Sequence, residues 1–442
     1  MSGIHFCARR NAGGRRDRAA RGTQPIETRD RVNRAGRRAV TVVLLLLGAW
    51  EVGRSLFRID GVVFHDYLRV GQVVLQHGDP YATLSFDTWP PFFIFIAVAL
   101  TEVARISRVG ALLIWQLGSL AALWGACRLL ARLAGAKPEP RTSAATLVRL
   151  AMTARLLQEH LQSTQINLYL LFLVLLAFYL FRQRRNAMGG LALATAVSAR
   201  AVPIVFLAYL LYKRAWRAAA WTAGFLAVLN VVLPLLTFGR ALTAERWTEW
   251  RTVAAAETAN PTPMFPNQSL LAALRRLLTR EGGARDPIRY AVAEWPPQRV
   301  ERLFYALAAI GALALAFAFR RHPPGLDDPS LLGELAVGLC ILPLLSPLAW
   351  KAHFVSLLAG YWLIWRAMQG VKVRRGVWLA WWASFACLTL TAPALISTDG
   401  RSVVESLNVI TLGALLVLGL TIWAARRLPQ QPPTSAAGPT QP

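Results

Sequence analysis

Several apolar stretches of this chain are long enough to cross a lipid bilayer, and this feature constrains the fold more than any other. Crossing ~30 Å of hydrocarbon takes about 20 helical residues. Stretches such as 109–133 and 403–425 exceed that length, and others approach it. We therefore predict an all-α polytopic membrane protein with about ten to twelve transmembrane helices. The segment 134–165 does not allow a unique count.

The composition agrees with lipid as the solvent. Hydrophobic residues make up 55% of the chain and charged residues 16%, with a mean hydropathy of +0.40. Soluble domains are usually about 45–50% apolar and about 25% charged. A soluble enzyme, a nucleic-acid binder and a disordered chain are therefore all excluded as readings of the whole sequence.

The chain has a net charge of +26, and the positions of its cations indicate a membrane topology. Cations cluster between apolar runs, as is typical of the cytoplasmic ends of membrane helices. These clusters are Arg182 with Arg184 and Arg185, Lys213 with Arg214 and Arg217, Arg320 with Arg321, and Lys372 with Arg374 and Arg375. Residues 1–38 contain eleven Arg against three acids. We interpret them as a disordered cytoplasmic tail near anionic lipid headgroups.

The remaining organisation is one transmembrane domain over 39–428 and a second disordered cytoplasmic tail over 429–442. The first span, about 39–57, lacks a cleavage site and is expected to stay in the membrane. Two long loops, 58–90 and 239–300, should be extracytoplasmic. In the first loop, apolar residues at helical spacing predict a short interfacial helix. Gly78 and Pro80 should end it.

Residues 187–212 predict a broken helix. Cations at both ends place both ends in the cytoplasm, and 26 residues are too short for two crossings. Arg200 and Pro203 lie at its centre, so we predict two half-helices that meet at Arg200. An Arg inside the membrane indicates a functional site. Alternatively, Arg200 reaches a lipid headgroup.

Motifs typical of soluble enzymes are absent, and polar residues are concentrated on the predicted external face. These polar residues are His65, Asp66, His77, Asp79 and Asp87; Gln165 and Asn167; Asn267, Gln268 and Ser269; and Ser346, Trp350, Lys351 and His353. The pattern predicts a site assembled from several external loops above a helical bundle.

Five short motifs, in order along most of the chain, resemble those of glycosyltransferase family 87, a family of polyprenyl-phosphate-mannose-dependent enzymes in the GT-C membrane superfamily. They are Asp66-Tyr67 with Gly78-x-Pro80-Tyr81 and Trp89-Pro90-Pro91; Gln165-Ile166-Asn167; Arg200 with Pro203; Asn267-Gln268-Ser269-Leu270 with Arg275; and Ser346-Pro347-x-x-Trp350-x-x-His353. The chain departs from the family pattern at Thr164 for a glycine, at Arg200 for a lysine and at Ala352 for a histidine.

The resemblance implies a GT-C-like bundle in the plasma membrane that performs an inverting sugar transfer on the extracytoplasmic face. The donor would be a sugar, typically mannose, on a polyprenyl phosphate. The acceptor would be a lipid-linked glycan or a glycolipid. The donor sugar, the acceptor and the linkage are not specified by the sequence.

On this reading Asp66 is the general base that takes the proton of the acceptor hydroxyl. Arg200, followed by Arg275 and His353, would stabilise the charge that develops on the leaving phosphate. Because arginine alone can do this, no metal or other cofactor is expected. The residues expected to contact the acceptor or the sugar are Tyr67, Tyr81, Gln165, Asn167, Asn267, Gln268 and Trp350.

Structural roles compete with these assignments. Asp66 could solvate its helix, His353 could be an ordinary hydrogen-bonded residue, and Trp350 could be an interface anchor. Gln165 and Asn167 could cap the span that follows. For the whole protein, the alternatives are a transporter or flippase of a lipid-linked substrate, and a glycan polymerase or ligase. A transporter should show matching broken helices in both halves, and only 198–203 has that pattern.

Overall fold

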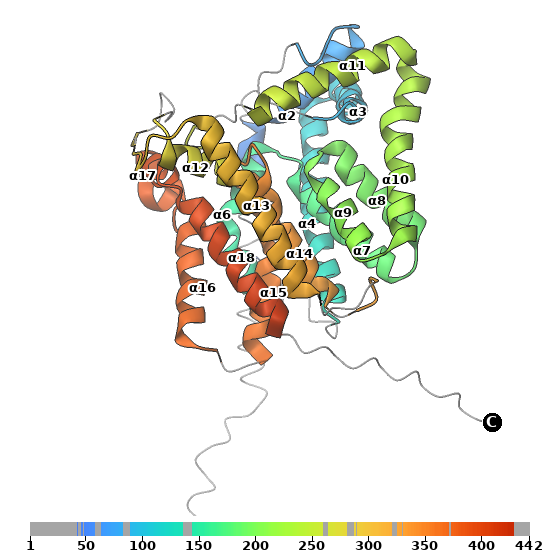
Figure 1. The fold of residues 1–442 in the computed structure, drawn as a ribbon. Coiled ribbons are helices and arrows are strands. Elements are labelled where there is room, and N and C mark those ends of the chain that lie inside the picture. The colour runs from blue at the N-terminus through green and yellow to red at the C-terminus, as the bar shows by residue number, and fades with distance from the viewer. Residues whose placement is uncertain are drawn as a thin grey trace, which may run out of the picture.

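The computed structural model describes residues 42, 46, 48–57, 63–82, 89–135, 144–259, 264–280, 287–288, 290–320, 325–328, 330–370 and 373–427. Within this part of the chain every regular element is helical and no strand occurs, which confirms the all-α class (Figure 1). The predicted tails, 1–38 and 429–442, lie outside the described residues.

The first helices build one corner of the molecule. Residues 48–56 are helical and are followed by α2 (Val63–Leu75), α3 (Phe93–Ile106) and α4 (Arg108–Leu133). The short helix α2 matches the predicted interfacial helix and lies with α3 at the top of Figure 1. It buries one face, and Gly71 lets it pack closely on α3.

The segment 134–165 contains two short helices, α5 (Ala144–Met152) and α6 (Ala154–Ser163). The chain then bends by 116° into α7 (Asn167–Arg182). The bend lies at Thr164, whose backbone is left-handed with φ 54°. Left-handed backbone favours glycine, which explains why the family pattern has a glycine at this position.

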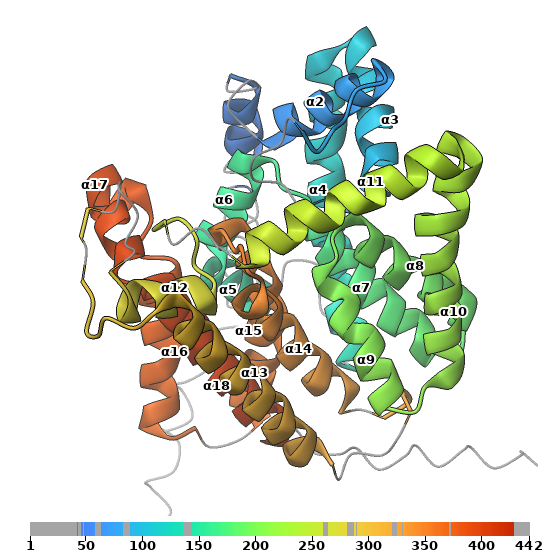
Figure 2. The same cartoon turned by 45° about the horizontal axis from the view of Figure 1, so that its top comes forward.

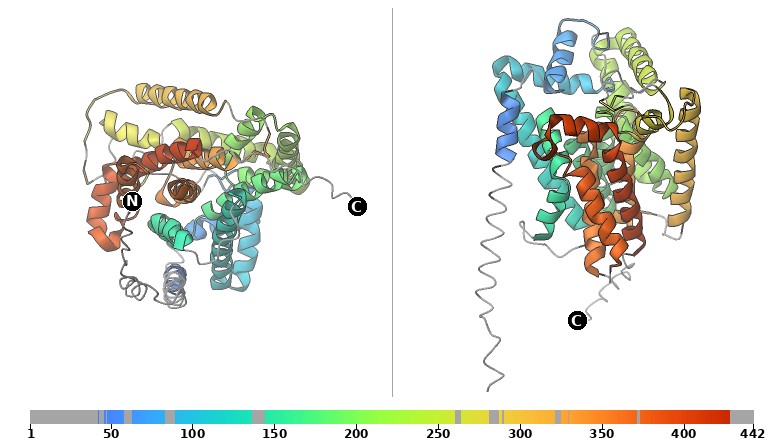
Figure 3. Two further views of the ribbon diagram at one scale, coloured as in Figure 1. Left: turned by 90° about the horizontal axis from the view of Figure 1, so that it is seen from below. Right: turned by 90° about the vertical axis from the view of Figure 1, so that its left-hand side faces the viewer.

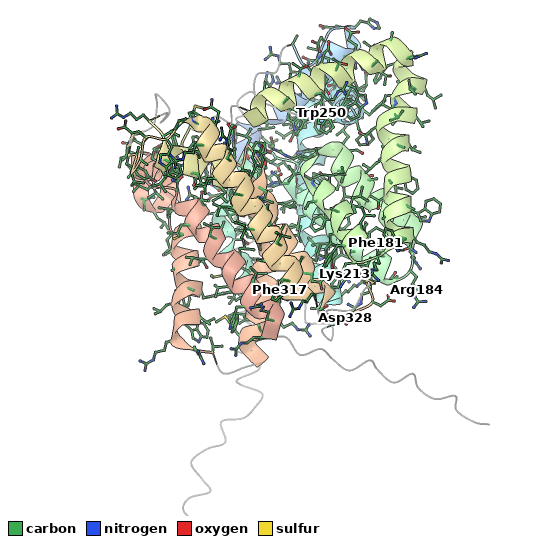
Figure 4. The ribbon with its side chains drawn as sticks, in the orientation of Figure 1. Phe181, Arg184, Lys213, Trp250, Phe317 and Asp328 are labelled. Atoms are coloured by element: carbon green, nitrogen blue, oxygen red, sulfur yellow. The ribbon has the colours of Figure 1, made fainter. Side chains whose placement is uncertain are left out.

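The predicted broken helix is confirmed. Helix α8 (Asn186–Ala199) ends at Arg200, and the chain continues through η1 (Val202–Ile204) into α9 (Val205–Tyr212). Arg184, just before α8, and Lys213, just after α9, both lie at the lower end of the molecule (Figure 4). The segment therefore enters and leaves at one end, as the cation clusters predict.

A long span follows. Helices α10 (Trp216–Ala227), η2 (Val228–Val232) and α11 (Leu233–Ala259) are continuous until Gly239, where φ is 76° and the helix turns. Beyond this kink α11 lies across the top of the bundle (Figure 2). The span therefore ends where the long loop 239–300 was predicted to begin, and this loop starts with a helix on the surface.

The second half contains α12 (Leu270–Leu278), α13 (Pro297–Phe319), α14 (Leu331–Leu345), η3 (Lys351–Ser356), α15 (Leu357–Gly370), α16 (Arg375–Leu388), α17 (Pro393–Ser406) and α18 (Val409–Arg427). Helix α13 lies at the outer edge of this group (Figure 3). The predicted span 403–425 is wrong at its start. The left-handed backbone of Asn408, with φ 59°, separates α17 from α18.

Four described helices are long and apolar enough to cross a membrane, namely 108–133, 216–256, 297–319 and 409–427. The bent pair α6 and α7 would make a fifth. Shorter apolar helices, 186–199, 202–212 and 331–345, pack among them. The chain is thus a polytopic membrane protein, and the total of ten to twelve crossings remains a prediction.

Candidate functional site

A small cavity lies where α7 begins and where α8 and α14 end. Its polar lining comes from Asn167, Arg200, Ser346, His353 and Ser356, and its other lining residues are apolar. The cavity volume is about 50 Å³. Since one water needs roughly 10–15 Å³ of such volume, the cavity has room for a group about the size of a phosphate. Three predicted site residues, Asn167, Arg200 and His353, therefore meet here.

The break after α8 is what brings Arg200 to the cavity. Its backbone is extended, with φ −154° and ψ 125°, so the helix stops at this residue. Pro203 has no N–H to continue the helical pattern, and a 3₁₀ turn follows. A cation is thus held, half-buried, at a helix break among apolar neighbours, where its charge is poorly screened.

His353 is held by the backbone of η3. The N–H of Trp350 lies 2.9 Å from Nδ1, while the carbonyl of Trp350 accepts the N–H of His353 at 2.8 Å. Nδ1 also lies 3.0 Å from the carbonyl oxygen of Trp350, so this nitrogen contacts both backbone groups of one residue. Nε2 is buried and has no hydrogen-bond partner among the described residues. Burial and the nearby charge of Arg200 hold the pKa of His353 well below its usual range, so the ring is neutral.

Asp66 is half-buried on α2 and does not line the cavity. Burial raises the pKa of its carboxyl, with the charges of His65 and Arg69 acting in the opposite direction. The N-terminus of α2 is fixed to the bend before α7, because Thr164 Oγ1 accepts the N–H of Phe64 at 2.9 Å. The helix that carries Asp66 is thus attached to the bend at Thr164, and the chain after this bend leads directly to Asn167 in the cavity lining.

The two tyrosines of the first loop have structural contacts. Tyr67 is fully buried, and its ring centroid lies 4.9 Å from Trp89, 5.0 Å from Phe93 and 5.2 Å from Trp115. The hydroxyl of Tyr81 donates to the carbonyl of Trp89 at 3.1 Å. Both side chains hold α2 and the first loop in place and are not exposed for a ligand.

Asn267 and Gln268 join two loops. The Asn267 amide donates to the carbonyl of Pro347 at 3.0 Å and accepts the N–H of Ala349 at 3.0 Å. The Gln268 amide donates to the carbonyls of Phe265 at 2.6 Å and Glu405 at 2.8 Å. Gln268 Oε1 accepts the hydroxyl of Thr411 at 3.3 Å. These polar atoms are therefore occupied, and the motif fixes the loop that leads to η3.

The remaining predicted residues lie apart from the cavity lining. Gln165 is buried beside Asn167, with 3.5 Å between their amides. Trp350 is 37% exposed and lies directly before η3. Arg275 is buried on α12 and forms an ion pair with Glu301 of α13. Arg275 therefore does not join Arg200 and His353.

A buried charge cluster beside the cavity was not assigned a role from the sequence. Glu405 is fully buried, and its Oε1 lies 2.8 Å from Arg155, 2.9 Å from Lys351 and 2.9 Å from Arg401. Glu159 lies 3.5 Å from Lys351. The cluster holds α6, η3 and α17 together. The sequence signal was the charged pair Arg155 and Glu159 in a weakly apolar helix.

The fold and the cavity define a polytopic α-helical membrane protein with a cationic site where its helices end. The chain belongs to glycosyltransferase family 87, whose model matches residues 88–347. It is therefore a membrane glycosyltransferase.

Two relatives match over most of their length. Both are polyprenol-phosphate-mannose-dependent alpha-(1-2)-phosphatidylinositol pentamannoside mannosyltransferases. The protein from Mycobacterium tuberculosis is 28% identical over 381 residues, covering 82% of this chain and 80% of the relative. The protein from Mycolicibacterium smegmatis is 27% identical over 313 residues, covering 70% and 68%. No solved structure matches this chain.

Proposed function

We propose that this protein transfers mannose from a polyprenyl-phosphate donor to a glycolipid or lipid-linked glycan acceptor. The names of both relatives support the donor, and the phosphatidylinositol mannoside in those names supports a glycolipid acceptor. The observation that carries the site is the meeting of Arg200 with the unpartnered Nε2 of His353 in one apolar cavity. Arg200 as a cation, together with the neutral His353 in the tautomer that has its proton on Nε2, would suit a phosphate oxygen.

The proposed reaction is an inverting displacement. The acceptor hydroxyl oxygen forms a bond to the anomeric carbon while the bond between that carbon and the donor phosphate oxygen breaks. Asp66 takes the hydroxyl proton, and the phosphate leaves with the bonding electron pair. Arg200 and His353 then stabilise the charge that develops on the phosphate, which is favoured in a water-poor site. Arg275, paired with Glu301, has a supporting role in holding α12.

The size of the cavity supports binding of the phosphate alone. Ligand pockets usually have about 300–1,000 Å³, so the sugar and the acceptor would lie outside this cavity, toward α2. The positive-inside pattern supports an extracytoplasmic position for α2 and the surface part of α11. A donor held by its polyprenyl chain could reach this position from within the membrane.

The test is sugar transfer by the purified protein in nanodiscs, with EDTA present. The samples contain polyprenyl-phosphate-mannose and a panel of glycolipid acceptors, and the wild type is compared with Asp66→Asn. We expect mannose transfer by the wild type and its loss in the variant. Equal transfer by both would reject Asp66 as the base. Transfer only from another polyprenyl-phosphate sugar would reject the mannose donor, and loss of transfer with EDTA would reject a metal-independent reaction.

A further inference from the structure

A second, larger groove lies at the end of the molecule opposite the cavity. It has a volume of about 870 Å³ and shares no lining residue with the cavity. Its lining residues are Arg184, Arg185, Asn186, Ala187, Met188, Arg217, Ala220, Trp221 and Gly224. Arg184 marks its position at the lower end, while Trp250 of α11 lies at the upper end (Figure 4). We call this feature the basic groove.

The basic groove has an excess of positive charge. Arg184 and Arg185 lie in the turn between α7 and α8, and Arg217 lies in the first turn of α10. Arg184 forms an exposed ion pair with Asp327 at 3.5 Å. In the described part of the chain, no hydrogen bond or ion pair occupies the guanidinium groups of Arg185 and Arg217. Two cations in this groove are therefore available to an anion.

Two helices begin at the same place. Neither α8 nor α10 has a side-chain cap at its N-terminus. The first N–H groups of an α-helix have no carbonyl partner within the helix, and the N-terminus carries a partial positive charge. These backbone groups add to the attraction that the arginines exert on an anion.

The other half of the basic groove is apolar and exposed. Trp221 is 49% exposed and Met188 is 57% exposed. Gly224, one turn after Ala220 on α10, leaves open space beside Trp221. Helices α8 and α10 pack closely beneath the groove, because Gly190 of α8 contacts the backbone of Trp221. A Cβ added to Gly190 would lie 2.8 Å from the carbonyl carbon of Trp221. Tryptophan at this depth is typical of the membrane interface.

We propose that the basic groove binds an anionic phospholipid. The headgroup phosphate would lie on Arg185 and Arg217, with Arg184 at its edge, and an acyl chain would lie along Trp221 and Gly224. Basic pockets between transmembrane helices have this chemistry. The apolar half of the groove favours a lipid over free phosphate. The cation clusters at this end place the bound lipid in the cytoplasmic leaflet.

The test is lipid binding by native mass spectrometry of the purified full chain. Cardiolipin, which carries two phosphates, is compared with phosphatidylcholine. The variant Arg184→Gln/Arg185→Gln/Arg217→Gln should bind cardiolipin about 100-fold more weakly, from about 1 kcal/mol per arginine. The matched control, Arg374→Gln/Arg375→Gln/Arg426→Gln, removes three exposed cations from other helices. It should bind as the wild type does.

A second variant tests the groove without changing its charge. The Cβ of a residue at position 224 would meet no atom within 4 Å, so Gly224→Trp should fold and fill the groove. We expect it to lose cardiolipin binding as the triple variant does. Equal binding by Gly224→Trp and the wild type, or equal loss in the two triple variants, would overturn the proposal. Displacement of cardiolipin by inorganic phosphate would overturn the assignment to a lipid.

Discussion

Asp66 combines a half-buried position with a proposed role, that of general base, which requires it to be ionised. Its burial raises the pKa of the carboxyl. A general base works only when it is deprotonated, so activity should fall as the pH drops through this raised pKa. We therefore expect the acidic limb of kcat/KM to lie above the value of about 3.9 typical of Asp. Transfer rates measured across pH in nanodiscs check this, and an acidic limb near the ordinary value would contradict it.

At the residue scale, the sequence predicted a set of polar site residues but could not distinguish between their structural positions. Arg200 and His353 lie in the cavity, while Asn267 and Gln268 donate to the backbone of the loop after α14 and of α17. All four have the same appearance in a sequence, as polar residues beside apolar spans. Only the distant backbone partners decide which amides are already occupied, and no local pattern encodes those partners.

At the scale of elements, α2 is positioned by its contact with α3. A Cβ on Gly71 would lie 2.1 Å from Thr101 Oγ1 and 2.5 Å from the carbonyl oxygen of Ala97. Gly71→Ala must therefore push the two helices apart, at a cost of about 2 kcal/mol. Because α2 carries Asp66, transfer should fall as well. Thermal unfolding in detergent and the transfer assay measure the two effects.

The control for this variant is Gly311→Ala on α13, where an added Cβ meets no atom within 4 Å. It should keep wild-type activity, and its stability should stay the same or rise, since alanine favours helix more than glycine does. If Gly71→Ala and Gly311→Ala behave alike, the close packing of α2 on α3 is not what positions the base.

Helix breaks were predictable where the sequence carries a breaker. Pro203 and the charge of Arg200 predicted the break after α8. The bend at Thr164 and the division at Asn408 were missed, because both depend on left-handed backbone at residues that are not glycine. At Thr164 the strain is offset locally, since its hydroxyl caps α2 and its carbonyl accepts the indole N–H of Trp115 at 2.9 Å.

At the scale of the whole molecule, the buried charge cluster joins elements that are distant in sequence. Glu405 of α17 contacts Arg155 of α6 and Lys351 of η3, two residues before His353. Glu405→Gln would leave three cations beside Glu159 alone. Removing one partner of a buried ion pair costs about 3–5 kcal/mol, so we expect a large loss of thermal stability in detergent.

The matched control is Glu294→Gln, which breaks an ion pair with Arg280 whose side chains are 58% and 77% exposed. Exposed pairs contribute about 1 kcal/mol or less, so this variant should unfold near the wild-type temperature. A Glu405→Gln protein as stable as Glu294→Gln would show that the cluster does not hold α6, η3 and α17 together.

The polytopic all-α architecture was predictable from apolar length alone, because lipid demands helices whose backbone groups are paired internally. The assembly of the cavity was predictable only through the family resemblance. Asn167, Arg200 and His353 come from three elements, and more than 150 residues lie between the first and the last of them. The cluster around Glu405 was not predicted, since the charges of α6 are visible in the sequence but their contact with α17 is not.

The proposed reaction depends on binding of the donor phosphate by Arg200 and His353. The most direct measurement is the affinity of purified protein for labelled polyprenyl phosphate, which contains the phosphate but no sugar. Arg200→Gln and His353→Ala should each weaken binding by about 10-fold or more, from hydrogen bonds to a charged group. Arg302→Gln, an exposed change on α13, should bind as the wild type does. Unchanged affinity in both cavity variants would contradict the account.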